Sequence, residues 1–224
     1  MTNHTQREAF LHGEGDHWFE RNRPALEAAN PLRDRVIERI AAQLPSDSRS
    51  RVLEVGCGLG QNLDALAARR PIDAHGVDPS PAAVEAGRSR FPALALDVGT
   101  ADALPYPDAA FDVVWFGFCF YLVDRTLLQR AVSEADRVLA DGGLLAVLDF
   151  DPDVPTVRTY HHRPGLRSYK MDHSRLFLAN PAYVLVDKLA LSHMPDCAWQ
   201  ADPQERVALT LSRKSLAYAY KDLG

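Results

Sequence analysis

The segment Val52-Leu-Glu-Val-Gly-Cys-Gly-Leu-Gly60 determines how the rest of this 224-residue sequence is interpreted. It begins with a short β-branched and apolar run, which is typical of a strand. Glycines then alternate with other residues, and a helical pattern starts at Gln61. A strand, a glycine turn and a helix in this order indicate a place where a ligand approaches backbone amides at a helix N-terminus.

Strand-like and helix-like segments alternate on both sides of this loop as far as residue 150. Apolar residues at helical spacing predict helices over residues 32–44, 61–70, 80–90 and 125–140, the last closed by Asp141-Gly142-Gly143. Short apolar runs predict strands over residues 51–55, 72–77, 93–98, 111–116 and 144–150. This alternation predicts an α/β fold with a Rossmann-like, doubly wound and mostly parallel sheet that carries helices on both faces.

The pattern changes after residue 150. Residues 151–173 are polar, aromatic and rich in histidine, with no regular period, and a short helix is predicted at 174–179. Two strand-like runs follow, at 183–193 and 206–214, and they most simply pair antiparallel. We therefore predict a single domain over 1–224, which consists of an N-terminal lid or cap segment (1–31), a cofactor-binding core (33–150), a substrate-side insertion (151–180) and a C-terminal β-hairpin (181–215).

Composition excludes several classes of protein. Lys and Arg total 25 against 30 for Asp and Glu, and this net charge of −5 disfavours a nucleic-acid partner. The three cysteines form no CxxC pair, which disfavours a zinc ribbon or a disulfide framework. The longest apolar run, 113–123, is shorter than the about 20 residues that a bilayer span needs, and the polar N-terminus lacks a secretory pattern. We expect a cytoplasmic protein without a membrane partner.

Two carboxylates near the glycine loop define the expected ligand. The loop reads GxGxG, without the GxGxxG of a dinucleotide fingerprint or the GK[ST] of a phosphate loop. Glu54 precedes it and suits a ligand that carries an ammonium group, whereas Asp78 ends the next strand and can accept hydrogen bonds from a ribose diol. The ligand therefore has a ribose and a cationic or zwitterionic tail. A glycine turn alone also occurs as a tight connection in any doubly wound protein.

Four segments in this order resemble the class I S-adenosylmethionine-dependent methyltransferases of the small-molecule type. They are residues 52–60, 76–80, 103–114 and 137–143, and the resemblance covers about residues 33–150. The resemblance implies a seven-stranded sheet with an antiparallel last strand. It also implies S-adenosyl-L-methionine as the methyl donor and S-adenosyl-L-homocysteine as the product.

The resemblance implies roles for individual residues. Gly56 and Gly58 would leave room for the methionine part of the cofactor, which Glu54 would help to orient. Asp78 would bind the ribose. Thr100 stands where the family normally has an acid that reads the adenine. The full set of predicted cofactor-binding residues is Trp18, Arg21, Glu54, Gly56, Cys57, Gly58, Asp78, Pro79, Thr100, Ala101, Asp102 and Phe116, with Cys57 mainly a small packing residue of the loop.

Two segments outside the core are candidates for covering the cleft. In residues 13–22, Trp18 can cover a pocket and Arg21 can pair with the cofactor carboxylate, although a surface helix with tucked-in aromatics explains the segment equally well. This segment, together with residues 61–63, also weakly resembles methylases associated with nonulosonic-acid sugar biosynthesis. In residues 160–173, His161 or His162 is a candidate general base and Tyr160 a candidate partner. The alternative for that segment is a solvated loop.

A metal site is not predicted. Asp149, Asp151 and Asp153 alternate at a strand end and would point to opposite sides, so they do not form one set of ligands. The sequence therefore favours methyl transfer to O or N of a small polar metabolite. The alternatives are methylation of carbon, a macromolecular acceptor, or a cofactor-binding subunit without catalysis. The oligomeric state stays open, with a homodimer as one option.

Overall fold

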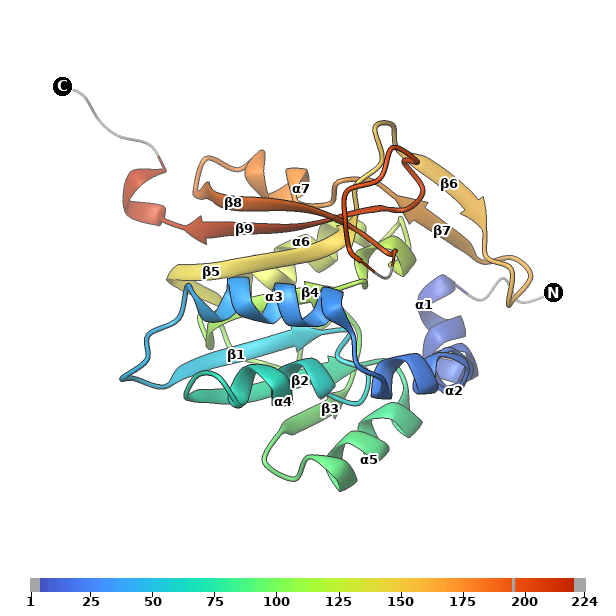
Figure 1. Cartoon of the computed structure of the whole chain (residues 1–224), viewed down its shortest axis with the longest axis horizontal. Helices are drawn as coiled ribbons and strands as arrows, with labels where there is room; N and C mark the ends of the chain where they lie inside the picture. Colours follow the sequence, from blue (N-terminus) through green and yellow to red (C-terminus); the bar gives the residue numbers. More distant parts are fainter. Residues whose placement is uncertain (1–4, 195, 220–224) are drawn as a thin grey trace.

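A seven-stranded sheet forms the centre of the computed structural model, which describes residues 5–194 and 196–219 (Figure 1). The strand order is β3-β2-β1-β4-β5-β9-β8. The strands are β1 (Ser50–Val55), β2 (Ile72–Asp78), β3 (Ala95–Val98), β4 (Phe111–Gly117), β5 (Leu139–Phe150), β8 (Tyr183–Ser192) and β9 (Arg206–Lys214). The first five pair parallel, and β9 is antiparallel to both of its neighbours. The predicted mostly parallel sheet with an antiparallel last strand is confirmed.

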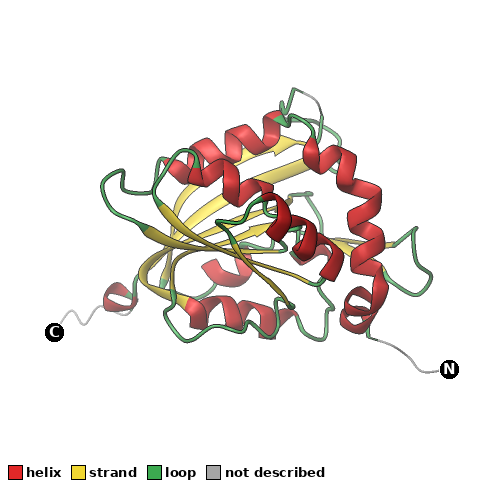
Figure 2. Ribbon diagram, turned by 90° about the horizontal axis from the view of Figure 1, so that it is seen from below, coloured by secondary structure: helices red, strands yellow, loops and turns green. Residues whose placement is uncertain are grey.

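Helices cover both faces of the sheet (Figure 2). Side chains alternate along each strand, so that Val52 and Trp115 belong to one buried cluster and Leu53 and Phe116 to the cluster on the other face. The first cluster includes residues of α3 (Pro31–Ala41), α4 (Gln61–Ala67) and α5 (Pro81–Arg90). The second includes residues of α6 (Leu128–Val138) and α7 (Arg175–Leu178). Burial on both faces explains why the strands are nearly continuous apolar runs.

Local capping rules set the starts of two predicted helices. The Asn30 side chain accepts a hydrogen bond from the amide of Arg33 at 3.1 Å, and Pro31 occupies the first turn of α3. The Ser80 hydroxyl accepts one from the amide of Ala83 at 3.0 Å, and Pro81 begins α5. A proline at the first position costs no hydrogen bond, since that amide has no partner within the helix.

The boundary between α6 and β5 differs from the prediction. The helix begins at Leu128, after a turn in which Asp124 accepts from the amide and hydroxyl of Thr126. It ends at Val138, and β5 follows at once over residues 139–150. The prediction that Asp141-Gly142-Gly143 closes a helix is therefore wrong. Leu139 is buried and already pairs with Phe111 of β4, so the chain extends before it reaches those glycines.

Residues 151–173, which have no regular period in the sequence, contain a second small sheet. The strands β6 (Thr156–Thr159) and β7 (Arg167–Lys170) pair antiparallel. Most of their side chains are exposed or half-buried. A hairpin without a buried face does not produce an alternation of apolar and polar residues, which explains why the pattern does not predict it.

The N-terminal segment and this hairpin lie together at the carboxyl ends of the parallel strands (Figure 1). The N-terminal segment consists of α1 (Gln6–Ala9), η1 (Phe10–Glu14) and α2 (Gly15–Glu27). The Gln6 side chain donates to the carbonyls of Leu122 and Arg167, and it accepts from the amide of Arg167 at 3.1 Å. We call residues 6–27 and 156–170 together the roof. Two short 3-10 turns complete the described chain, η2 (Phe120–Leu122) and η3 (Leu216–Tyr218). No helix within the described residues is both long and apolar enough to cross a bilayer.

Candidate active site

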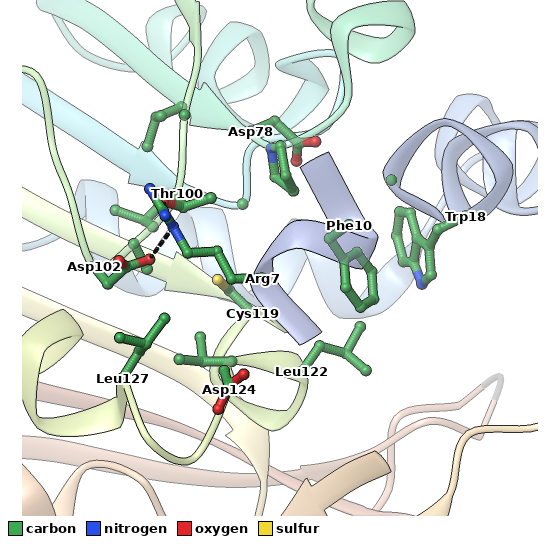
Figure 3. A pocket seen from close by; sticks show the side chains of 18 of the residues that line it. Arg7, Phe10, Trp18, Asp78, Thr100, Asp102, Cys119, Leu122, Asp124 and Leu127 are labelled. Carbon is green, nitrogen blue, oxygen red and sulfur yellow. Dashed lines mark hydrogen bonds and ion pairs between the residues drawn. The ribbon is translucent and has the colours of Figure 1, made fainter. Parts of the chain in front are cut away.

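A cleft opens beneath the roof, at the carboxyl ends of the parallel strands (Figure 3). Its empty volume is about 830 Å³, the open mouth included. The loops that follow β1 to β4 form its wall, and residues of α1, η1 and α2 line it from the roof. This is the position at which ligands bind in open parallel sheets.

The glycine loop after β1 adopts a backbone that other residues rarely take. Gly56, Gly58 and Gly60 have φ angles of 77°, 55° and 88°. Gly56 lines the cleft, and a Cβ there would lie 2.9 Å from the Cβ of Cys119 in the loop after β4. The Gly58 amide donates to Asp78 Oδ2 at 2.9 Å. Cys57, between them, is buried. The glycines therefore permit both the turn and the close approach of two neighbouring loops.

Asp78 ends β2 and lines the cleft. Its carboxylate accepts from the amides of Gly58 and Ser80, both at 2.9 Å. Burial raises the pKa of Asp78 to about 6, while the two amide hydrogen bonds act in the opposite direction. Two amides thus hold the carboxylate in a fixed orientation, with Pro79 beside it in the lining.

Glu54 lies directly behind the wall. It is fully buried, its Oε1 accepts from Asn62 Nδ2 at 2.7 Å, and its Oε2 has no partner. A Cβ on Gly117, which lines the cleft, would lie 3.1 Å from Glu54 Oε1. Burial raises the pKa of Glu54 to about 8. A buried carboxyl with an unpartnered oxygen is costly in the protein alone, and a nearby positive charge would offset that cost.

Arg7 crosses the cleft from the roof to the loop after β3 (Figure 3). Its Nε donates to Thr100 Oγ1 at 3.2 Å and pairs with Asp102 Oδ1 at 3.3 Å. Thr100, Ala101 and Asp102 all line the cleft, as expected of the segment that would read the adenine. Arg7 is not predictable from the sequence, because a single arginine in a polar N-terminal segment carries no distinguishing pattern.

The loop after β4 supplies the other side of the wall. Its lining residues include Gly117, Phe118, Cys119, Leu122, Val123, Asp124 and Leu127. Phe118 has a φ of 53°, which is uncommon for a bulky residue. Phe116, a predicted cofactor contact, does not line the cleft but is buried, and its ring stacks on Phe120 with ring centres 4.1 Å apart. The lining in this region begins at Gly117, where β4 ends, because ligands bind beyond the carboxyl ends of parallel strands.

The roof residues named from the sequence fall into two groups. Trp18 lines the cleft together with Phe10 and Gly15. Arg21 and Tyr160 lie outside the lining, where Arg21 Nη2 donates to Glu14 Oε1 at 2.7 Å and to the Tyr160 hydroxyl at 2.9 Å. The Tyr160 hydroxyl also donates to Glu14 Oε1 at 3.0 Å. Burial, and then the nearby Glu14, raises the pKa of Tyr160. These two side chains therefore hold the roof together and do not face the cleft.

His161 and His162 also lie outside the cleft lining. Both are exposed, in the turn that joins β6 to β7. The Tyr160 ring packs edge-on against His162, with ring centres 5.4 Å apart. The structure does not bring either histidine to the cleft, so their catalytic role stays a prediction from the sequence.

The three alternating aspartates have separate partners. Asp149 lies 3.3 Å from His173, Asp151 pairs with Lys188 at 3.0 Å, and Asp153 pairs with Arg206. Within residues 5–194 and 196–219, no group of three or more His, Cys, Asp or Glu side chains is arranged to hold a metal ion.

Known proteins share this fold and parts of this sequence. A family model described as a methyltransferase domain matches residues 52–143. The 27-O-demethylrifamycin SV methyltransferase of Amycolatopsis mediterranei (strain S699) is 36% identical over 152 residues, which are 62% of this chain and 53% of that protein. Ajmaline N-methyltransferase of Rauvolfia serpentina is 30% identical over 137 residues, which are 54% of this chain and 46% of that protein. The chain thus spans about half the length of the curated relatives it matches.

A solved structure agrees over most of the chain. The Burkholderia thailandensis 1,6-didemethyltoxoflavin-N1-methyltransferase, crystallised with 1,6-didemethyltoxoflavin and S-adenosylhomocysteine, superposes with a TM-score of 0.72. The match covers 92% of this chain and 88% of that chain at 14% identity, so it shows only that the two proteins share a fold. The family match over residues 52–143, the relatives and the strand order agree with one another. Residues 52–143 of the chain therefore form a methyltransferase domain, and the whole sheet has the Rossmann-like fold of the S-adenosylmethionine-dependent methyltransferases.

Proposed function

We propose that this protein transfers a methyl group from S-adenosylmethionine to the oxygen or nitrogen of a small molecule. The observation that carries the proposal is the buried Glu54, whose second oxygen is unpartnered behind a wall that also presents Asp78. The two carboxyls match a ligand with a positively charged end and a ribose. Two of the relatives are named as methyltransferases of small molecules, one for 27-O-demethylrifamycin SV and one for a nitrogen of ajmaline.

The lining residues suit the parts of the cofactor one by one. The Asp78 carboxylate would accept hydrogen bonds from the ribose hydroxyls, and Gly56 would leave room for the methionine chain. Pro79 and Ala101 would flank the adenine, with the Thr100 hydroxyl as an acceptor for its amino group. Glu54 would stabilise the ammonium end through the unpartnered oxygen. These contacts position the methyl group, which the cofactor supplies in an activated form.

Catalysis would then rest on positioning. Holding donor and acceptor in one geometry converts a reaction between two molecules into a step within one complex, and no covalent role for the protein is required. Trp18 and Phe10, which line the cleft from the roof, would exclude water from the transfer. Neither exposed histidine of the β6–β7 turn is needed in this arrangement.

Calorimetry with S-adenosylhomocysteine and a methyl-transfer assay with a panel of small acceptors test the proposal together. We expect tight binding of S-adenosylhomocysteine and methylation of at least one acceptor. Absence of any binding heat would refute the cofactor site. Binding without methylation of any acceptor would instead favour a cofactor-binding subunit that lacks catalysis.

A further inference from the structure

The end of the cleft away from Thr100 and Asp102 is apolar and aromatic. Phe10, Trp18 and Leu122 gather there, from the roof and from the loop after β4 (Figure 3). Phe118 and Val123 also belong to the lining. Trp18 and Leu122 both pack against the buried cluster that includes Phe10. Flat aromatic side chains favour a flat acceptor, because stacked rings bury a large apolar area while few rotatable bonds become fixed.

The charges in the lining are unbalanced. Among the described residues that line the cleft, Arg7 is the one basic side chain, against the carboxylates of Asp78, Asp102 and Asp124. Arg7 is held at the opposite end by Thr100 and Asp102. An acidic acceptor would therefore meet net negative charge, and the positive charge of Arg7 is already paired with Asp102. Removing an unpaired anion from water is costly, so this lining selects against carboxylates and phosphates.

The lining also has no suitable proton acceptor at its apolar end. The Asp124 carboxylate accepts from the backbone amide of Gln6 at 3.0 Å, and from the backbone amide and the hydroxyl of Thr126. Burial acts to raise the pKa of Asp124, but these hydrogen bonds hold it below the ordinary value. Burial raises the pKa of the Cys119 thiol, which keeps it protonated. An acceptor that must lose its proton before reacting finds no base here, whereas an uncharged amine already offers its lone pair.

From this lining, and resting on the proposed function, we propose that the acceptor is a planar aromatic molecule that is methylated on an uncharged amine nitrogen. The nitrogen lone pair forms the new N–C bond while the S–C bond breaks and its electrons return to sulfur. The sulfonium becomes a thioether, and the positive charge moves to nitrogen. When the acceptor is a secondary amine, the methylated ammonium product then releases its proton to water. The aromatic faces and nearby carboxylates stabilise the cationic product.

Matched probes test the proposal. Bicyclic and tricyclic aromatic scaffolds, each carrying a secondary amine, a hydroxyl or a carboxylate, are titrated into the protein saturated with S-adenosylhomocysteine. We expect the amines to bind at least tenfold more tightly than the carboxylates. With S-adenosylmethionine at pH 7.5, mass spectrometry should find methyl groups on nitrogen. Equal or tighter binding of the carboxylates, faster methylation of the hydroxyl probes, or binding of none of the probes would overturn the inference.

A charge variant sharpens the test. Asp124→Asn removes one negative charge from the lining and keeps one side-chain oxygen, which can still accept from Thr126, whereas the acceptor for the Gln6 amide is lost. It should narrow the preference for amine over carboxylate probes by threefold or more. Asp108→Asn is the matched control, since Asp108 is exposed and pairs with Arg137 away from the cleft, and it should leave the preference unchanged. An unchanged preference in Asp124→Asn counts against the charge argument. Failure of the cofactor site is separable, because it abolishes the heat of S-adenosylhomocysteine binding before any probe is added.

Discussion

The wall and the roof of the cleft are built in different ways. The wall uses backbone: the amides of Gly58 and Ser80 fix Asp78, and buried strands carry the loops. The roof uses side chains that reach across the chain, such as Arg21, which contacts a tyrosine 139 residues away. The wall is therefore encoded locally, in short motifs, whereas the roof depends on the folded core beneath it. Perturbing the wall should change ligand binding most, and perturbing the roof should change local stability.

The largest effect is expected at Asp78. Asp78→Ala removes the proposed acceptor for both ribose hydroxyls and should weaken S-adenosylhomocysteine binding by about 3 kcal/mol, since each hydrogen bond to a charged group contributes about 1.5 kcal/mol. Calorimetry measures the change. Asp73→Ala is the control in the same strand, because Asp73 is exposed and contacts His75. Equal affinities for wild type and Asp78→Ala would exclude the ribose role.

Glu54 should show a conflict between stability and binding. The pKa of Glu54 is about 8 in the folded protein, against 4.5 ordinarily. The free energy of unfolding should therefore fall as the pH rises from about 4.5 toward 8. Glu54→Gln removes the ionisation and should stabilise the protein by up to about 4 kcal/mol at pH 7.5, but by less than about 1 kcal/mol near pH 5. Urea unfolding at both pH values tests this expectation. A gain independent of pH would contradict it, and cofactor affinity should fall in the same variant.

Cofactor affinity should also depend on pH through Asp78. In the proposed site the ribose hydroxyls would bind the ionised carboxylate, and the pKa of Asp78 in the free protein is about 6. Protonation competes with binding below that value, so affinity should fall about tenfold, or about 1.4 kcal/mol, between pH 7 and pH 5. Calorimetry at several pH values gives the profile. A flat profile across pH 6 would show that Asp78 does not titrate in the free protein.

A smaller effect, on stability, is expected for a substitution in the roof. Tyr160→Phe removes a hydroxyl that bonds Glu14 and Arg21, and it should destabilise the protein by about 1 kcal/mol. Amide hydrogen exchange should accelerate in residues 6–27 and 156–170, with little change in β1 and β4. Uniform acceleration over the whole sheet would mean that the roof unfolds only with the core.

The smallest effect is expected for the exposed turn. His161→Ala and His162→Ala should leave turnover within about twofold of wild type, because surface changes away from a site are usually neutral. A tenfold loss of turnover at unchanged S-adenosylhomocysteine affinity would restore the catalytic role that the sequence suggests.

The same contrast explains what the sequence can predict. The strands, the glycine loop and Asp78 follow from patterns within a few residues of one another, so the sheet and the wall are predictable. Arg21 and Tyr160 have the chemistry of site residues, but their pairing with Glu14 becomes visible only in the folded chain. The sequence places Phe116 at the cleft, but the lining begins one residue later, at Gly117, because patterns do not fix the end of a strand to a single residue. The hairpin β6–β7 has no buried face and therefore no pattern to detect.

Arg7 and Phe10 lie three residues apart in the same short helical region, yet one reaches the adenine end of the cleft and the other its apolar end. A kink follows them, where Gly13 has a φ of 118° and open space around its missing side chain. A single short segment of the roof therefore contributes both the polar contact at one end of the cleft and the apolar surface at the other.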